Sequence, residues 1–226
     1  MKQMIKKIPF LRNLISKFFP LFHKPVSFSN TFEYWEERYK KGGNSGAGSY
    51  NKLAEFKAEV INKFVSKHSI KEVIEFGCGD GNQLQYFQFT TYIGYDVSST
   101  AISICKAKYR NDDTKTFKLT ESYNGEIVEL ALSLDVIFHL IEDKTYSNYM
   151  KRLFSASNKY VIIYSSNKND VYKIKSHVKH RKFTDWVDDN RPEYKLIKYI
   201  PNKYPFNGDG ETTSFADFYI YEKEDK

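Results

Sequence analysis

The sequence predicts one α/β domain built on a doubly wound, mostly parallel sheet, and three observations support this fold class. Its 226 residues suffice for one such domain with a full core. Short apolar runs alternate with helical patterns along most of the chain, and each parallel crossover needs a covering helix. One apolar run ends in the glycine turn 77–81. The last two apolar runs follow each other without a helix, so we expect a hairpin that ends the sheet.

The first expected helix covers residues 31–39, an aromatic and acidic stretch. Asn30 precedes it, a residue type that caps helix N-termini, and Glu33 stands three positions later as in a capping box. The helix is expected to end at the glycine- and serine-rich loop 40–50. A longer helix follows, predicted by apolar residues at helical spacing, which are Leu53, Phe56, Val60, Ile61, Phe64 and Val65.

From residue 71 onward, expected strands and helices alternate. Strands are expected at 71–76, 92–96, 116–119, 127–133, 160–164, 194–200 and 215–222. Helices are expected between them at 82–87, 99–108 and 144–155. Ser98 is a residue type that caps helices, so we expect it to begin the second of these.

The stretch VIEFGCGDG, residues 73–81, carries the strongest functional signal. A strand that delivers a tight glycine turn lets a nucleoside-bearing ligand approach backbone N–H groups with no Cβ in the way. Asp96 ends the next strand, one strand–helix–strand unit after Glu75, and a carboxylate there can bind two ribose hydroxyls. A dinucleotide fingerprint would need its third glycine at position 82, which is Asn82. An ordinary β–α turn without a ligand remains the alternative.

These two motifs in this order resemble motifs I and II of class I S-adenosylmethionine-dependent methyltransferases, over about residues 31–222. The resemblance implies a Rossmann-like sheet of seven strands with the last one antiparallel, S-adenosylmethionine as cofactor, and methyl transfer as activity. It also implies a lid over the cofactor at about residues 31–50, with a linker as the alternative. The residues expected to bind cofactor are Glu75, Gly77, Cys78, Gly79, Gly81, Asp96, Val97, Ser133, Tyr39 and Gly43.

The stretch SLDVIFHLIED, residues 133–143, follows the fourth strand at the position that faces the transferred methyl group in this family. Asp135 and His139 are four residues apart, so one helical turn would place a carboxylate and an imidazole on one face. We expect His139 to act as general base, with Asp135 orienting it or touching the cofactor. The alternative for His139 is a histidine that satisfies nearby backbone groups.

A cationic cluster, HVKHRKF, lies between the fifth and sixth strands. Its members His177, His180 and Arg181 are expected to bind a phosphate or carboxylate of the methyl acceptor. The alternative is a solvated charge run that nearby aspartates balance. No metal site is predicted, because no second histidine or cysteine pair has recognisable ligand spacing.

The net charge of +7 is concentrated at the front of the chain. Residues 1–24 contain six lysines and arginines and no acidic residue, which leaves about +1 for the remainder. A nearly neutral catalytic domain makes a nucleic-acid partner unlikely and favours a small-molecule acceptor, for which an anionic group is one option.

The stretches YWEERYKKGGNSG, EFGCGDG, SLDVIFHLIED and HRKFTDW together are similar to methyltransferases found with surface-glycan biosynthesis. This resemblance implies methyl transfer to an oxygen of a sugar or sugar phosphate. A protein or nucleic-acid methyltransferase and a non-catalytic cofactor-binding subunit remain alternatives.

Residues 1–28 form a basic amphipathic segment ahead of a domain expected at 29–226. Its first 24 residues suit contact with an anionic membrane surface, while packing on the domain or on a partner subunit is the alternative. No apolar run is long enough to span a membrane. Two cysteines without a pairing pattern favour a reducing cytoplasm, with peripheral contact at the inner membrane surface as a further option. The oligomeric state stays open.

Overall fold

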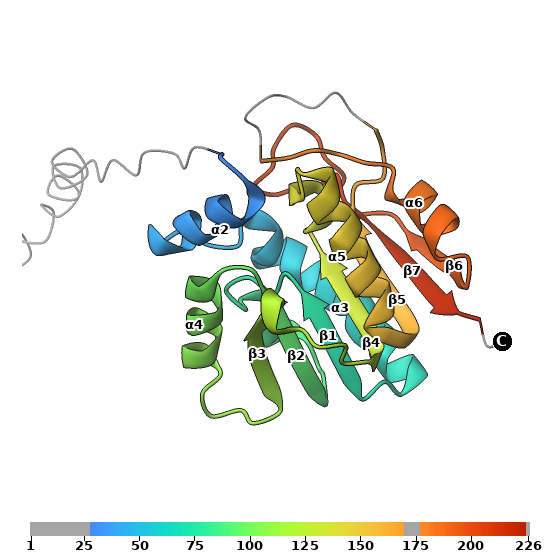
Figure 1. Ribbon diagram of the computed structural model, residues 1–226, viewed down its shortest axis with the longest axis horizontal. Helices are drawn as coiled ribbons and strands as arrows, with labels where there is room; N and C mark the ends of the chain where they lie inside the picture. The colour runs from blue at the N-terminus through green and yellow to red at the C-terminus, as the bar shows by residue number, and fades with distance from the viewer. Residues whose placement is uncertain (1–27, 170–176, 225–226) are drawn as a thin grey trace, which may run out of the picture.

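The structure is a computed structural model that describes residues 28–169 and 177–224 (Figure 1). The membrane contact expected through residues 1–24 therefore lies outside the described residues. Within the described ranges, no helix is both long enough and apolar enough to cross a membrane.

A seven-stranded sheet in the order β3-β2-β1-β4-β5-β7-β6 forms the centre of the molecule. Its strands are β1 (Glu72–Phe76), β2 (Thr91–Asp96), β3 (Lys115–Leu119), β4 (Val128–Leu134), β5 (Ser157–Ser165), β6 (Tyr194–Ile200) and β7 (Asp217–Lys223). The neighbours from β3 to β5 pair in parallel, whereas β7 is antiparallel to both β5 and β6. The predicted mostly parallel sheet, its terminal hairpin and its antiparallel last strand are confirmed.

Helices cover both faces of this sheet. They are α3 (Asn51–His68), α4 (Ser99–Lys108), α5 (Asp143–Ser155) and α6 (Phe183–Asn190), whereas α2 (Thr31–Lys40) belongs to neither of the two buried clusters. Ile61 of α3 and Ile102 of α4 belong to one buried cluster, while Leu153 of α5 and Phe183 of α6 belong to the other. In Figure 1, α5 lies in front of the sheet and α3 behind it. Both faces are thus buried, which parallel strands require.

Two elements differ from expectation. The helix predicted at 82–87 is only a 3₁₀ turn, Gln83–Tyr86, because the buried rings of Phe87 and Phe89 must both reach the core before β2 begins. Helix α6 was not predicted. Its buried stripe consists of little more than Phe183 and Val187 in a segment rich in aspartate, so its helical period is weak in the sequence.

Helix α2 begins with the expected cap and is docked there onto the segment that follows β4. The Glu33 N–H donates to Oδ1 of Asn30 at 2.9 Å, which satisfies one of the first amides of the helix. The hydroxyl of the next residue, Thr31, donates to the Glu142 carboxylate at 2.7 Å. The start of α2 is thereby fixed beside the carboxyl end of β4.

Farther along α2, the buried carboxylate of Glu36 docks the helix onto the N-terminus of α4. It accepts hydrogen bonds from the hydroxyls of Ser98 at 2.5 Å and Thr100 at 2.9 Å, and also from the Ser99 hydroxyl and the Thr100 N–H. Burial alone would raise the pKa of Glu36, but these hydrogen bonds lower it to about 2. The positive end of the α4 dipole also favours a carboxylate here. Figure 1 shows α2 and α4 side by side.

Glu75, in β1, is a fully buried carboxylic acid. Its two oxygens accept hydrogen bonds from the Tyr92 hydroxyl at 2.5 Å and the Gln83 amide at 2.9 Å. Burial raises its pKa to about 7, although both hydrogen bonds and the charge of Lys57 act in the opposite direction. Oε1 of Gln83 is buried without a hydrogen-bond partner among the described residues, so an amide rotation would let a protonated Glu75 donate to it.

We expect Glu36→Ala to release α2 without unfolding the domain. The variant removes the carboxylate that accepts hydrogen bonds from the start of α4. This should lower the free energy of local unfolding of α2 by about 1–3 kcal/mol. Hydrogen exchange should become faster across residues 31–40 while the β4 amides keep their protection. Glu37→Ala is the matched control, since Glu37 is exposed and pairs only with Lys41. Unchanged exchange of α2 in Glu36→Ala would contradict the docking role.

Glu75→Gln should alter how stability depends on pH. Between the unfolded pKa of 4.5 and the folded pKa of about 7, the folded state holds a proton that the unfolded state lacks, so wild type loses stability as pH rises through this window. The variant is neutral throughout. The free energy of unfolding of wild type minus that of the variant should fall by about 3 kcal/mol from about pH 5 to about pH 8. Urea denaturation at a series of pH values measures it, and parallel curves would contradict it.

Candidate functional site

A cavity opens at the carboxyl edge of the sheet, and α2 forms part of its wall. Its empty volume is about 640 Å³, including the solvent at its mouth. It is bordered by the ends of β1, β2 and β4, where the order of strands along the sheet reverses. Doubly wound sheets bind their ligands in the crevice at such a reversal.

The ten residues expected to bind cofactor divide into two equal groups. Those that border the cavity are Tyr39, Gly77, Gly79, Asp96 and Val97. Those that do not border it are Glu75, Cys78, Gly81, Ser133 and Gly43. The structure thus brings the lid, the glycine turn and the end of β2 together around one space.

At two positions of the glycine turn, neighbouring side chains lie so close to the backbone that there is no room for a Cβ. Gly77 and Gly79 have φ values of +87° and +57°, which favour glycine. A Cβ on Gly77 would collide with the Val136 side chain, and one on Gly79 would collide with the Ser45 hydroxyl. Only glycine therefore lets the lid and the segment after β4 meet at this turn.

Asp96 fixes the glycine turn from the end of β2. Its two carboxylate oxygens accept hydrogen bonds from the N–H groups of Gly79 and Ser98, both at 2.9 Å. Burial raises the pKa of Asp96 to about 6, against the effect of these hydrogen bonds. The carboxylate borders the cavity and keeps further acceptor capacity for ribose hydroxyls.

The residues that were expected to bind cofactor but do not border the cavity make contacts within the protein instead. Cys78 is buried beneath the turn, where Cys105 lies within 3.1 Å of the Gly79 carbonyl. Gly81 packs against Cys105 and Tyr109, and the Gly43 N–H donates to the Arg38 carbonyl where α2 ends. Ser133 is buried with its hydroxyl 2.7 Å from that of Tyr149, and Glu75 lies between its two partners in the core.

The loop after α2 is fastened to the glycine turn. The Ser45 N–H donates to the Asp80 carboxylate at 3.0 Å, and the Asp80 N–H donates back to the Ser45 hydroxyl at 2.9 Å. The Tyr50 hydroxyl donates to the same carboxylate, and the Tyr39 hydroxyl lies 2.9 Å from that of Ser45. Burial raises the pKa of Tyr39 far above its usual range, so its hydroxyl stays protonated. These contacts hold the loop after α2 against the glycine turn, and its role as a lid stays a prediction.

Of the two roles expected for Asp135, orienting His139 does not fit the structure, and touching the cofactor stays a prediction. The intervening residues form a 3₁₀ turn, Ile137–His139, rather than an α-helical one, and Asp135 itself has a φ of +60°. Its carboxylate pairs with the fully buried ammonium of Lys57 at 2.6 Å. Nδ1 of His139 lies 2.8 Å from the carbonyl oxygen of His177, which can only accept, so Nδ1 carries the proton.

His139 borders the cavity as a neutral imidazole. Burial lowers its pKa to about 3, although the hydrogen bond to the His177 carbonyl acts in the opposite direction; the charges of His177 and Arg38 lower it further. Its ring meets the Trp35 ring edge to face at 4.9 Å and is stacked on the His177 ring at 5.3 Å. Because Nδ1 is occupied, Nε2 is the nitrogen with a lone pair to accept a proton.

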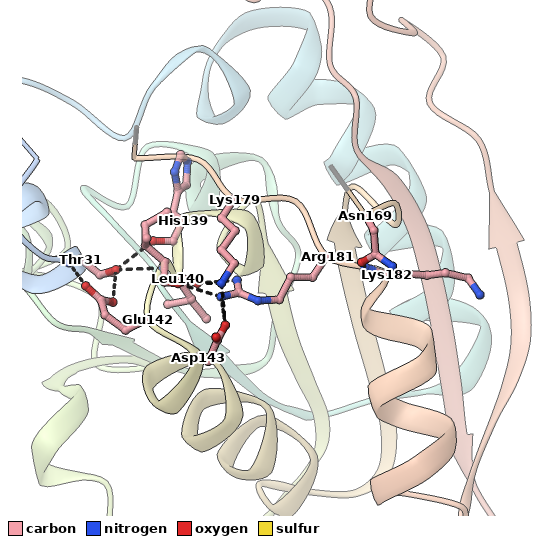
Figure 2. Close-up of polar contacts among 10 residues, drawn as sticks. Thr31, His139, Leu140, Glu142, Asp143, Asn169, Lys179, Arg181 and Lys182 are labelled. Carbon is pink, nitrogen blue, oxygen red and sulfur yellow. Dashed lines mark hydrogen bonds and ion pairs between the residues drawn. The ribbon is translucent and has the colours of Figure 1, made fainter. Parts of the chain in front are cut away.

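The cationic cluster of residues 177–182 does not form the expected anion site. The Arg181 guanidinium donates to the carbonyls of Leu140 and Ile141 and to the Asp143 carboxylate, as Figure 2 shows. The Lys179 ammonium also pairs with Asp143, at 2.7 Å. These cations are engaged in holding the segment after β4 and do not border the cavity.

His180 is likewise placed away from the cavity, with Nδ1 2.6 Å from the Ser166 hydroxyl. The His177 ring is sandwiched between those of Tyr34 and His139. Among the residues of the two described ranges, no three metal-ligating side chains are grouped as a metal site.

Sequence reasoning missed Lys57 and Tyr149. Lys57 stands in the buried stripe of α3, four residues from Leu53 and from Ile61, and a cation in an apolar stripe was a readable signal. Tyr149 borders the cavity from α5 and donates to the Phe76 carbonyl at 2.9 Å. Nothing in its local pattern distinguishes it from other core tyrosines.

Comparison with known proteins identifies the family. The model of a family described as "Methyltransferase domain" matches residues 49–204, which is more than half of the chain. No curated protein matches the chain.

Solved structures share the fold at low sequence identity. The N-methyltransferase NodS from Bradyrhizobium japonicum WM9 is 10% identical, with a TM-score of 0.65 over 87% of this chain and 100% of that one. Magnesium protoporphyrin IX methyltransferase from Synechocystis PCC 6803 is 13% identical, with a TM-score of 0.56 over 75% and 83%. The methyltransferase domain of bacterial CtHen1 is 18% identical, with a TM-score of 0.55 over 76% and 100%.

The family match and the seven-stranded fold agree with the cavity formed by the glycine turn and Asp96. The chain belongs to the class I methyltransferases, and its cofactor is S-adenosylmethionine.

Proposed function

We propose that this methyltransferase transfers the methyl group to a hydroxyl oxygen of a small molecule, with His139 as general base. The carrying observation is the hydrogen bond from His139 Nδ1 to the His177 carbonyl at 2.8 Å. It fixes the tautomer in which Nε2 has the free lone pair, in a ring that borders the cavity. A hydroxyl attacking a sulfonium must lose its proton, and a neutral imidazole can take it.

The charges around the cavity support a neutral acceptor rather than an anionic one. Two carboxylates, Asp96 and Asp135, border the cavity, and no lysine or arginine of the described residues does so. The cations of the expected anion site are held by Asp143 and by backbone carbonyls. The negative potential of these carboxylates attracts the sulfonium and the ammonium of the cofactor and repels an anionic acceptor.

A small acceptor is supported by the enclosure of the cavity. Trp35 and Tyr39 border it from α2, which is docked at both of its ends. The near neutrality of residues 25–226 also disfavours a nucleic-acid acceptor. The similar solved structures include an N-methyltransferase, a carbon methyltransferase and a small RNA methyltransferase, so the fold does not select the acceptor.

Within small molecules, we propose a sugar hydroxyl as the first acceptor to test. The support is the sequence resemblance to methyltransferases of surface-glycan biosynthesis, together with the aromatic Trp35 beside His139, since aromatic rings pack on the C–H faces of sugars. Incubating the protein with methyl-labelled S-adenosylmethionine and separated small-molecule, protein and nucleic-acid fractions of a cell extract tests the class. Label in either macromolecular fraction alone would contradict the proposal.

Gly79→Ala should abolish cofactor binding. Its Cβ would collide with the lid at Ser45 in addition to the strain of a positive φ. Gly125→Ala is the matched control, because Gly125 has a φ of +84° with open space around it. Calorimetry with S-adenosylhomocysteine should show normal affinity for the control alone. Normal affinity of folded Gly79→Ala would show that the turn does not hold the cofactor.

His139→Ala should lower kcat by about 10²–10⁴ while S-adenosylhomocysteine affinity stays within a few fold of wild type. His139→Asn should be equally slow, because its amide can donate to the His177 carbonyl but cannot act as a base. His68→Ala removes a histidine outside the cavity and should keep the wild-type rate. The assay is methyl transfer to the labelled small-molecule fraction. A wild-type rate for His139→Ala would remove the general base from the proposal.

A further inference from the structure

A buried ion pair beneath the cavity has no part in the reaction described so far. Lys57 of α3 is fully buried, and its ammonium lies 2.6 Å from Oδ2 of Asp135. The ammonium also lies 5.4 Å from the centre of the Tyr164 ring. Burying such a pair carries a large desolvation cost, and apolar side chains of similar size often stabilise a core as well. Stability alone therefore does not account for this ion pair.

The backbone at Asp135 is held in a strained conformation where it borders the cavity. Its φ of +60° is rare for a residue other than glycine, and its N–H donates to the Tyr164 carbonyl at 2.9 Å. The lid loop lies directly against its side chain, because a Cβ on Gly48 would stand 2.6 Å from Oδ2. Strain of this kind persists where surrounding structure imposes it, and it clusters at ligand sites.

The Asp135 carboxylate has one oxygen left for a ligand. Oδ2 accepts a hydrogen bond from the Lys57 ammonium, and no described residue donates one to Oδ1. Asp96 borders the same cavity at the end of β2, next to the glycine turn. Asp135 borders this cavity from just beyond the end of β4, so a cofactor whose ribose bound Asp96 would have room for its methionine part beside Asp135.

We propose that the Asp135 carboxylate binds the α-ammonium of the methionine part of S-adenosylmethionine. Lys57 is a positioning residue that holds the carboxylate from beneath and balances part of its charge. An ammonium offers three donors and a positive charge, which match a carboxylate that borders a cavity lined by no lysine or arginine of the described residues. This inference rests on the cofactor and is independent of the acceptor and of His139.

The test compares two neutral-sulfur ligands on the full chain by calorimetry. S-adenosylhomocysteine carries the ammonium, whereas methylthioadenosine has the same nucleoside and lacks the amino-acid part. Asp135→Asn should weaken S-adenosylhomocysteine binding by about 10- to 100-fold, the range for a charged hydrogen bond, and leave methylthioadenosine binding unchanged. Asp112→Asn, a surface aspartate outside the cavity, should change neither affinity.

The role of Lys57 is tested by a double-mutant cycle. Lys57→Met, which keeps the length of the side chain, should weaken S-adenosylhomocysteine binding when made alone. In the Asp135→Asn background it should have no further effect, because its partner's charge is already gone. Additive losses would show that Lys57 acts on the ligand by another route and would overturn the positioning role.

Three outcomes would overturn the ammonium assignment. The first is unchanged affinity of Asp135→Asn for S-adenosylhomocysteine. The second is an equal loss for methylthioadenosine, which would place Asp135 at the nucleoside. The third is a loss for S-adenosylmethionine alone, which would place it at the sulfonium. If the variant does not fold, wild type can be titrated with the homocysteine analogue whose ammonium is replaced by hydrogen. Affinity equal to that for S-adenosylhomocysteine would then reject the proposal.

Discussion

The close approach of three backbone segments at the glycine turn is the constraint on which the site depends. Gly77 lies against Val136 of the segment after β4, and Gly79 lies against Ser45 of the lid. Because no Cβ stands between them, the lid and the end of β4 come together over the end of β2. Asp96 holds the turn in place through the Gly79 N–H. The cavity, its lid and its candidate base are all positioned relative to this contact.

Charge is divided between the inside and the outside of the site. The cavity wall contains carboxylates at Asp96 and Asp135, and the second is balanced by an ammonium buried beneath it. Outside the wall, Lys179 and Arg181 converge on the exposed Asp143 and brace the segment that carries the proposed base, as Figure 2 shows. Cations near the site therefore act on the protein's own groups. The cavity therefore suits the positively charged sulfonium and ammonium of the methyl donor. It does not suit a methyl acceptor that is an anion.

Sequence patterns predicted the elements well where the signal is local. The caps at Asn30 and Ser98 are confirmed, because a cap depends on a residue and the amides two or three positions later. Partners of charged side chains are set by distant segments, so the sequence could not pair Lys57 with Asp135 or turn Arg181 inward onto backbone carbonyls. The seven strands were predictable from the periodicity of apolar residues. The prediction of an anion site assumed that the cationic side chains face solvent, whereas packing turns them toward groups of the protein.

The docking of α2 has a kinetic consequence. Trp35 and Tyr39 on this helix border the cavity, while Glu36 is bonded to the start of α4. A bound cofactor is enclosed by an element whose departure requires one carboxylate to give up four hydrogen bonds. The residence time of the product then depends on how often the helix lifts as well as on how tightly the product is held. Substitutions on the α4 side of α2 would change that time without touching the ligand.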